Sequence, residues 1–325
     1  MDELWMQFVF TLDATVRVAT PLILAAMAGI FSERAGIIDI SLEGKMLMAA
    51  FVAATLAALT GSPWLGLIGA IAASVFLSLI HGFASITNRG DQVVSGLAIN
   101  VLAFGATVTL GIAIFAQGGQ TPLLPKDSRF QAIELPFAEW IGQHIPIIGT
   151  VYKEVVSGHN LLIWLAILSV AITYYVLFHT KFGLRLRAVG EKPDAVDSAG
   201  ISVVKMRYQA VIIAGVLCGF AGAYLSTAHG ASFVMNMTAG KGYIALAAVI
   251  FGKWRPVPCL FACFLFGFMD AVASRLEGLE LPLIGEISTS LILMLPYIMT
   301  VVLLAGFVGK ATPPLAIGVP YRKER

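Results

Sequence analysis

Long apolar runs determine what this chain can fold into. Several stretches of about 20 residues carry almost no charge, and a helix of that length crosses a hydrocarbon core about 30 Å thick. Of the 325 residues, 58% are hydrophobic and 12% are charged, against roughly 25% charged in an average soluble domain. The sequence therefore predicts an all-α, polytopic membrane protein and excludes a water-soluble globule.

Nine apolar stretches are candidate membrane segments, and one of them is short. They are residues 8–31, 42–59, 64–87, 93–116, 161–178, 208–227, 243–251, 257–272 and 287–308. Segment 243–251 is too short to span and is predicted to be a half-helix or a re-entrant piece. The number of membrane helices therefore stays between eight and ten. Because this number is open, the side of the membrane on which the N-terminus lies is open too. Because Asp13 and Arg17 are costly in lipid unless paired, residues 1–16 are predicted to lie along the interface, with a membrane helix starting near Arg17 and bent at Pro21.

Charged loops orient these segments. Residues 181–207 carry six basic side chains against three acidic ones, and this segment, Lys253 to Arg255 and the basic C-terminus are predicted to be cytoplasmic. The proline-rich residues 117–160, with more acids than bases, are predicted to form an external loop on the side of Glu277 and Glu280. Within 181–207, Pro193 is predicted to open a short helix and Gly200 to end it. A polar helix there suits the docking of a cytoplasmic partner, and the chain reads as one membrane domain, 1–325.

Motifs of catalysis do not stand out in the sequence. The Gly306 to Lys310 stretch has the wrong spacing for a phosphate loop, the five histidines form no zinc-binding pair, and there is no Gly-x-Ser-x-Gly elbow. The three cysteines lie within apolar runs and read as packing residues. We therefore expect no catalytic residue, no metal site and no cofactor on this chain, and a net charge of +2 is too small to predict nucleic-acid binding.

Polar residues within membrane segments are the best candidates for a solute pathway. The cluster from Glu33 to Lys45 suits a broken stretch lining a cavity, although a helix start at the membrane surface explains it equally well. The uncharged group from Gln92 to Asn100 suits a neutral, polyhydroxylated substrate, with helix-to-helix hydrogen bonding as the alternative. A third group precedes the short apolar segment. The predicted pathway residues are Glu43, Gln92, Ser95, Asn100, Asn236, Thr238 and Tyr243.

Four stretches together resemble a known family. Residues 31–47, 91–100, 183–201 and 240–256 resemble the permease subunits of ABC importers in the branched-chain amino acid and ribose permease superfamily, nearest its nucleoside branch. The resemblance covers about residues 15–308. Two positions depart from the expected pattern, because Asp39 stands in place of an asparagine and Lys45 in place of an apolar residue.

The resemblance implies a division of labour in a bacterial cytoplasmic (inner) membrane. This chain and a second homologous permease, expected as a heterodimer, would form the pathway for nucleosides or related simple sugars. A separate ATPase subunit would bind ATP and magnesium, and an external binding protein would deliver the substrate. The residues expected to transmit ATPase closure are Glu191, Pro193, Asp194, Ala195, Asp197, Ala199 and Gly200. The alternative is a secondary transporter driven by protons or sodium through Asp39, Glu43 or Asp270, although no inverted repeat is evident.

Overall fold

The structure is a computed structural model, and it describes residues 2–144, 146–276, 280–281, 285–286, 294, 298, 301–302 and 311–323. Long helices dominate it. They are α1 (Asp2–Arg34), α2 (Leu42–Thr60), α3 (Pro63–Gly82), α4 (Gln92–Phe115), α7 (Leu161–His179), α10 (Val203–Tyr224) and α12 (Pro256–Leu276). These seven are long and apolar enough to cross a membrane, which confirms the predicted all-α, polytopic class.

Shorter elements connect the long helices. The helices are α5 (Ala138–His144), α6 (Pro146–Val151), α8 (Lys181–Glu191), α9 (Pro193–Ser198) and α11 (Lys241–Phe251). Single turns are η1 (Phe83–Thr87), η2 (Lys126–Ser128), η3 (Tyr152–Val156) and η4 (Leu225–His229), of which η1, η3 and η4 have π-helical hydrogen bonding. Two antiparallel pairs join β1 (Ala132–Ile133) to β2 (His159–Asn160) and β3 (Glu280–Leu281) to β4 (Gly285–Glu286).

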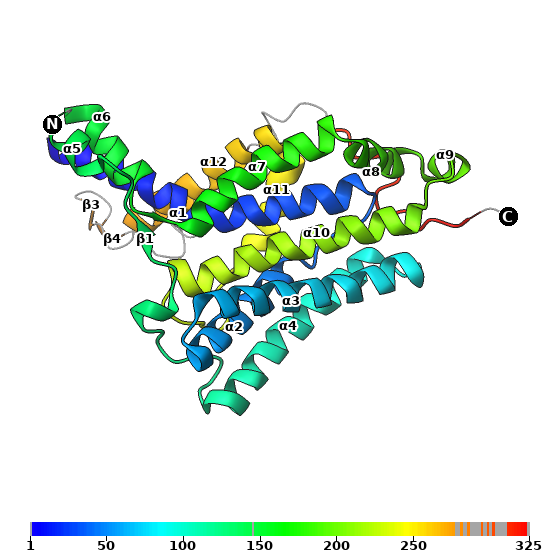
Figure 1. Cartoon of the computed structure of the whole chain (residues 1–325), viewed down its shortest axis with the longest axis horizontal. Helices are drawn as coiled ribbons and strands as arrows, with labels where there is room; N and C mark the ends of the chain where they lie inside the picture. Colours follow the sequence, from blue (N-terminus) through cyan, green and yellow to red (C-terminus); the bar gives the residue numbers. More distant parts are fainter. Residues whose placement is uncertain are drawn as a thin grey trace.

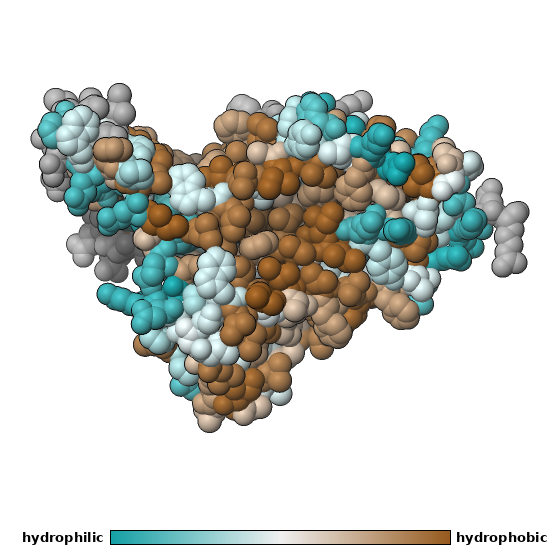
Figure 2. Space-filling model, viewed as in Figure 1, coloured by the Kyte–Doolittle hydropathy of each residue, from teal (hydrophilic) through white to brown (hydrophobic). Residues whose placement is uncertain are grey.

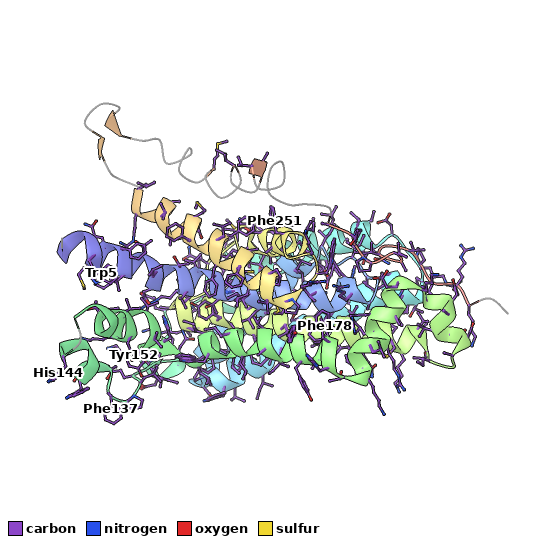
Figure 3. All side chains as sticks on the ribbon, turned by 90° about the horizontal axis from the view of Figure 1, so that it is seen from above. Trp5, Phe137, His144, Tyr152, Phe178 and Phe251 are labelled. Atoms are coloured by element: carbon purple, nitrogen blue, oxygen red, sulfur yellow. The ribbon has the colours of Figure 1, made fainter. Side chains whose placement is uncertain are left out.

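On the face seen in Figure 2, an apolar belt covers the middle of the molecule, and hydrophilic side chains gather at both ends. One end carries α5 and α6 and the start of α1, and the other carries α8 and α9 (Figure 1). Trp5, Phe137 and His144 lie at the first end, while Phe178 lies toward the second (Figure 3). Residues 117–160 and 181–207 therefore flank the belt on opposite sides, as a membrane-spanning bundle requires.

The predicted interfacial position of residues 1–16 is wrong. Helix α1 continues without a break from Asp2 to Arg34 and includes Pro21. Asp13 and Arg17 lie one turn apart and form a salt bridge of 3.0 Å, so neither charge needs a separate surface helix. Its 33 residues span roughly 50 Å, more than the hydrocarbon core, so the helix extends beyond the core.

The other predicted segments agree with the described helices, and α11 is short, as expected for segment 243–251. The core centres on α1, α2 and α10. Small residues of α10 allow close packing on its neighbours: a Cβ added at Gly219 would lie 2.6 Å from the backbone of Ile71, and one at Gly222 would lie 2.4 Å from the carbonyl oxygen of Met46. The predicted segment 287–308 lies outside the described residues except at Met294, Ile298, Val301 and Val302, and Glu277 and the side chain of Glu280 lie outside them too.

Candidate functional site

The connection between α1 and α2 enters the bundle instead of crossing its surface. Residues 35–41, called here the re-entrant segment, are non-helical and largely buried, and Gly36 turns the chain with φ +86°. Ile37 packs against Ile86 and Val211. Helix α2 then starts beside Gly29, five residues or roughly 7.5 Å before the end of α1. The cluster from Glu33 to Lys45 is therefore interrupted by a buried, non-helical stretch, and Ser41 and Glu43 lie at the start of α2, as the alternative also expects.

Side chains satisfy the backbone of the re-entrant segment. Non-helical backbone at membrane depth requires partners for its N–H and C=O groups, because lipid supplies none. The Ile38 N–H donates to Gln92 Oε1 at 2.7 Å, and the Ile38 carbonyl oxygen lies 3.0 Å from His81 Nε2. Asn100 accepts from the Gly44 N–H at 2.8 Å and donates to the Ile40 carbonyl at 3.0 Å. Gln92 and Asn100 thus hold α4 to the broken segment.

A buried ion pair fixes the turn into α2. The Lys45 ammonium lies 2.7 and 2.9 Å from the two Asp39 carboxylate oxygens, and both side chains are 0% exposed. Ser41 Oγ donates to the same carboxylate. The two positions that depart from the family pattern therefore compensate each other, because each buried charge neutralises the other.

Glu43 joins the start of α2 to the start of α11. Its two carboxylate oxygens accept the Gly240 N–H at 2.8 Å and the Gly242 N–H at 2.6 Å, at the N-terminus of α11 where a negative charge is favoured. A Cβ added at Gly242 would lie 2.5 Å from the Glu43 nitrogen, so only glycine fits there. The N-terminal end of the short helix α11 is therefore anchored to the start of α2.

Residues 231–240, which lead into α11, are non-helical and are called here the irregular wall. The Phe233 ring meets the Phe51 ring edge to face at 5.3 Å, and the Phe233 backbone bonds to Thr121 through both its N–H and its carbonyl oxygen, so this non-helical stretch runs along α2 from the end of the bundle that carries residues 117–160. Val234, Met235 and Asn236 follow it with exposed side chains. Irregular backbone is not tolerated against lipid. This face is therefore expected to be covered by protein or to line water.

The predicted pathway residues divide into two groups. Glu43, Gln92, Asn100 and Thr238 are buried, and Ser95 is half-buried beside His81 Nδ1 at 3.1 Å. Asn236 is exposed on the irregular wall, and Tyr243, in the first turn of α11, is 44% exposed and accepts at its hydroxyl from Asn100 Nδ2 at 2.9 Å. The structure thus brings Glu43, Gln92, Asn100 and Tyr243 into one network. Their role toward a substrate stays a prediction.

The seven predicted coupling residues lie together at one end of the bundle, on α8, α9 and the turn that follows (Figure 1). Residues 181–200 are called here the platform. Pro193 begins α9 and Gly200 follows it with φ +78°, as predicted. Glu191, Asp194, Ala195, Ala199 and Gly200 are exposed, and Pro193 and Asp197 are half-buried. A partner at this end can therefore reach most of these side chains.

The sequence reasoning missed two buried polar residues. Arg207 belongs by sequence to the basic segment 181–207, but it is 1% exposed and donates to the Ala35 carbonyl at 3.2 Å and to the Val319 carbonyl at 3.1 Å. His81 belongs to none of the predicted sites, yet it bonds the re-entrant segment. Only its position within an otherwise apolar helix hinted at a buried role.

Comparison with known proteins agrees with the class that this architecture defines, a multi-pass membrane permease. Residues 11–304 match the family model of the branched-chain amino acid transport system / permease component, and the chain belongs to this family. It is 42% identical over 318 residues to the guanosine ABC transporter permease protein NupQ of Bacillus subtilis, covering 96% of each chain. It is 39% identical over 314 residues to the nucleoside ABC transporter permease protein NupC of Lactococcus lactis, covering 94% of this chain and 95% of the relative.

Two further findings concern fold and pairing. An inward-facing ABC transporter structure superposes with a TM-score of 0.50 at 15% identity, covering 91% of this chain and 84% of the other, which supports the fold alone. Bacillus subtilis also has a second, more distant relative, the guanosine ABC transporter permease protein NupP, 26% identical over 80% of this chain and 72% of the relative. This chain is therefore an ABC transporter permease with nucleoside permeases among its relatives.

Proposed function

We propose that this chain is one membrane subunit of an ATP-driven importer that carries nucleosides or related simple sugars into the cell across the cytoplasmic membrane. The observation that carries the proposal is the platform: a mostly exposed polar surface built of two short helices and packed against the end of α1 and the start of α10. A separate ATPase subunit, holding ATP and magnesium, would dock there. The names of the similar permeases support the substrate class.

In an alternating-access mechanism, the platform would transmit movement of the ATPase to the membrane helices. Closure of the ATPase would displace α9, and the rigid connections from the platform into the bundle would rock the helices around the pathway between outward and inward openings. Neither Asp39 nor Glu43 is free to carry an ion in this arrangement, because the first binds Lys45 and the second caps α11. This weakens the alternative of a proton- or sodium-driven transporter.

A second permease would cover the irregular wall. Val234, Met235 and Asn236 are exposed on non-helical backbone, which would need a protein neighbour or water where it faces the membrane interior, and a partner permease facing it would supply both, with the pathway between the two chains. The exposed ring of Tyr243, oriented by Asn100, would then offer a flat apolar face to a nucleobase, with Asn236 as a hydrogen-bonding group. Solute would reach this pathway from an external binding protein.

Uptake by intact cells tests the proposal. Cells with and without the gene would be given labelled guanosine and uridine, with unlabelled ribose and leucine as competitors and a protonophore in a parallel sample. We expect loss of nucleoside uptake on deletion, resistance to both competitors, and persistence of uptake under the protonophore while cellular ATP stays high. Uptake that stops with the protonophore at normal ATP would favour the secondary transporter, and nucleoside uptake unchanged by deletion would refute the substrate assignment.

A further inference from the structure

Residues 311–323, called here the C-terminal strap, lie across the platform end of the bundle. Pro314 and Ala316 are buried, and Ile317 and Tyr321 pack against the main core. In Figure 1 the strap is the red trace that passes between α8 and the start of α10. Lys323 also lies 3.8 Å from Asp197 of α9, but the lysine is 71% exposed, so this ion pair contributes little. Besides this apolar packing, the strap is held by its backbone.

Two strap amides, two residues apart, bond to different parts of the molecule. The Ala316 N–H donates to the Gly190 carbonyl of α8 at 2.8 Å, and the Gly318 N–H donates to the Gly36 carbonyl of the re-entrant segment at 3.1 Å. Arg207 also joins the strap to the re-entrant segment, because it donates to Val319 of the strap through Nη1 and to Ala35 of the segment through Nε. The strap thus bonds to the platform on one side and to the re-entrant segment on the other.

The contact with the re-entrant segment leaves no room for a side chain. Gly36 has φ +86°, and a Cβ there would lie 2.9 Å from the Ala316 carbonyl oxygen. Gly318 has φ +75°, and a Cβ there would lie 2.9 Å from Ile38 Cδ1. Beyond Gly36, bonded contacts continue through Ile38 to α3 and α4. A movement of the strap is therefore passed to the segment and not absorbed in a gap.

The strap also shapes the surface that a docking partner would meet. A hollow of about 440 Å³ lies beside α9, and its lining includes Asp197, Gly200 and Ser202 together with Tyr321 and Lys323 of the strap. The platform and the strap therefore form one continuous surface.

We propose that the C-terminal strap is a positioning element of transport: it transmits displacement of the platform to the re-entrant segment, and from there to Glu43 and α11. The inference rests on the proposed function only in requiring an ATPase at the platform, and it does not depend on the substrate. The element that moves is the bonded unit of α8, strap and residues 35–41.

Hydrogen exchange on the assembled complex in lipid discs tests this inference without any transported solute. The complex would contain this chain, the second permease and the ATPase, and it would be compared with and without a non-hydrolysable ATP analogue. In the wild type, the analogue is expected to alter exchange in the platform, the strap and residues 36–41 together. In Gly36→Ala, the change is expected to persist in the platform but to be lost in residues 37–41.

Gly61→Ala is the matched control. Gly61 has φ +73°, so alanine brings the same backbone strain, but nothing lies within 4 Å of its added Cβ. If Gly36→Ala does not assemble, Gly318→Ala decides the question, because it disturbs the same contact from the strap side against a flexible Ile38 side chain. The inference would be overturned if the ATP analogue changed hydrogen exchange in residues 37–41 equally in the strap-contact variant and in Gly61→Ala. It would also be overturned if residues 37–41 responded in the wild type while the strap did not. A complex that responds as expected but does not import guanosine would refute the proposed substrate and leave this inference standing.

Discussion

The buried Asp39–Lys45 pair gives the sharpest energetic prediction. Both side chains are 0% exposed, and the ammonium lies within 2.9 Å of both carboxylate oxygens. Lys45→Met leaves the Asp39 carboxylate without its counter-charge, and Asp39→Asn does the same to the Lys45 ammonium. Breaking a buried pair by removing one partner costs about 3–5 kcal/mol, so each single variant should be strongly destabilised.

The double variant should behave differently. Asp39→Asn with Lys45→Met removes both charges at nearly constant volume and restores the residue types that the family pattern leads us to expect, so its stability should lie within about 1 kcal/mol of the wild type. With single losses of about 3–5 kcal/mol each and a double variant within about 1 kcal/mol of the wild type, the coupling free energy between the two sites should then be at least about 5 kcal/mol, more than 1,000-fold in the folded-to-unfolded ratio.

Thermal stability in detergent, followed by size-exclusion chromatography, measures the four members of this cycle, with membrane abundance as a second readout. Additive losses, in which the double variant is as damaged as the two single variants combined, would refute the argument. Uptake adds a discriminating result: a purely structural pair predicts that the double variant still transports, whereas a stable double variant that cannot transport would indicate that the charges take part in ion movement.

Three further predictions concern other contacts. Glu43→Gln replaces one acceptor oxygen by an amide that faces a backbone N–H, so it should cost about 1.5–3 kcal/mol of stability; unchanged thermal stability would show that the cap is unimportant. Gly222→Ala should destabilise by about 1–3 kcal/mol, because its Cβ would lie 2.4 Å from the Met46 carbonyl oxygen, whereas Gly105→Ala, with open space around its Cβ, should have no such clash; equal stability of the two variants would contradict the close approach of α10 and α2. Burial lowers the pKa of His159, although the Val155 carbonyl and Asp13 oppose this, so the fold disfavours the protonated ring. Stability should therefore fall as the pH drops below about 6.5, the ordinary histidine value, and His159→Gln should flatten this part of the pH profile; an identical profile in the variant would exclude His159 as its source.

The sequence predicts the helices well because length and hydropathy are local properties. Runs of about 20 apolar residues fix the position of α2, α3 and α4, and the short run before Gly252 correctly indicates an apolar segment that is too short to span. Proline and glycine chemistry likewise fixes both ends of α9. Each of these features depends on residues that are neighbours in the chain.

Contacts between distant segments could not be predicted in the same way. Arg207 looks like any cytoplasmic cation until the strap, more than 100 residues later, covers it. The polar group from Gln92 to Asn100 was recognised, but its hydrogen bonds to residues 38–44 depend on how α4 packs, which no local pattern encodes. The pairing of Asp39 with Lys45 was within reach of the sequence, since both departures from the family pattern lie six residues apart and have opposite charge.

Transport by a reconstituted complex tests the central claim most directly. Liposomes would contain this chain, the second permease and the ATPase, with the binding protein and labelled guanosine outside and ATP with magnesium trapped inside. The account predicts that guanosine accumulates only with internal ATP, that ATP is hydrolysed as it accumulates, and that ionophores which collapse proton and sodium gradients have no effect. Accumulation that proceeds without ATP and follows an imposed ion gradient would contradict it.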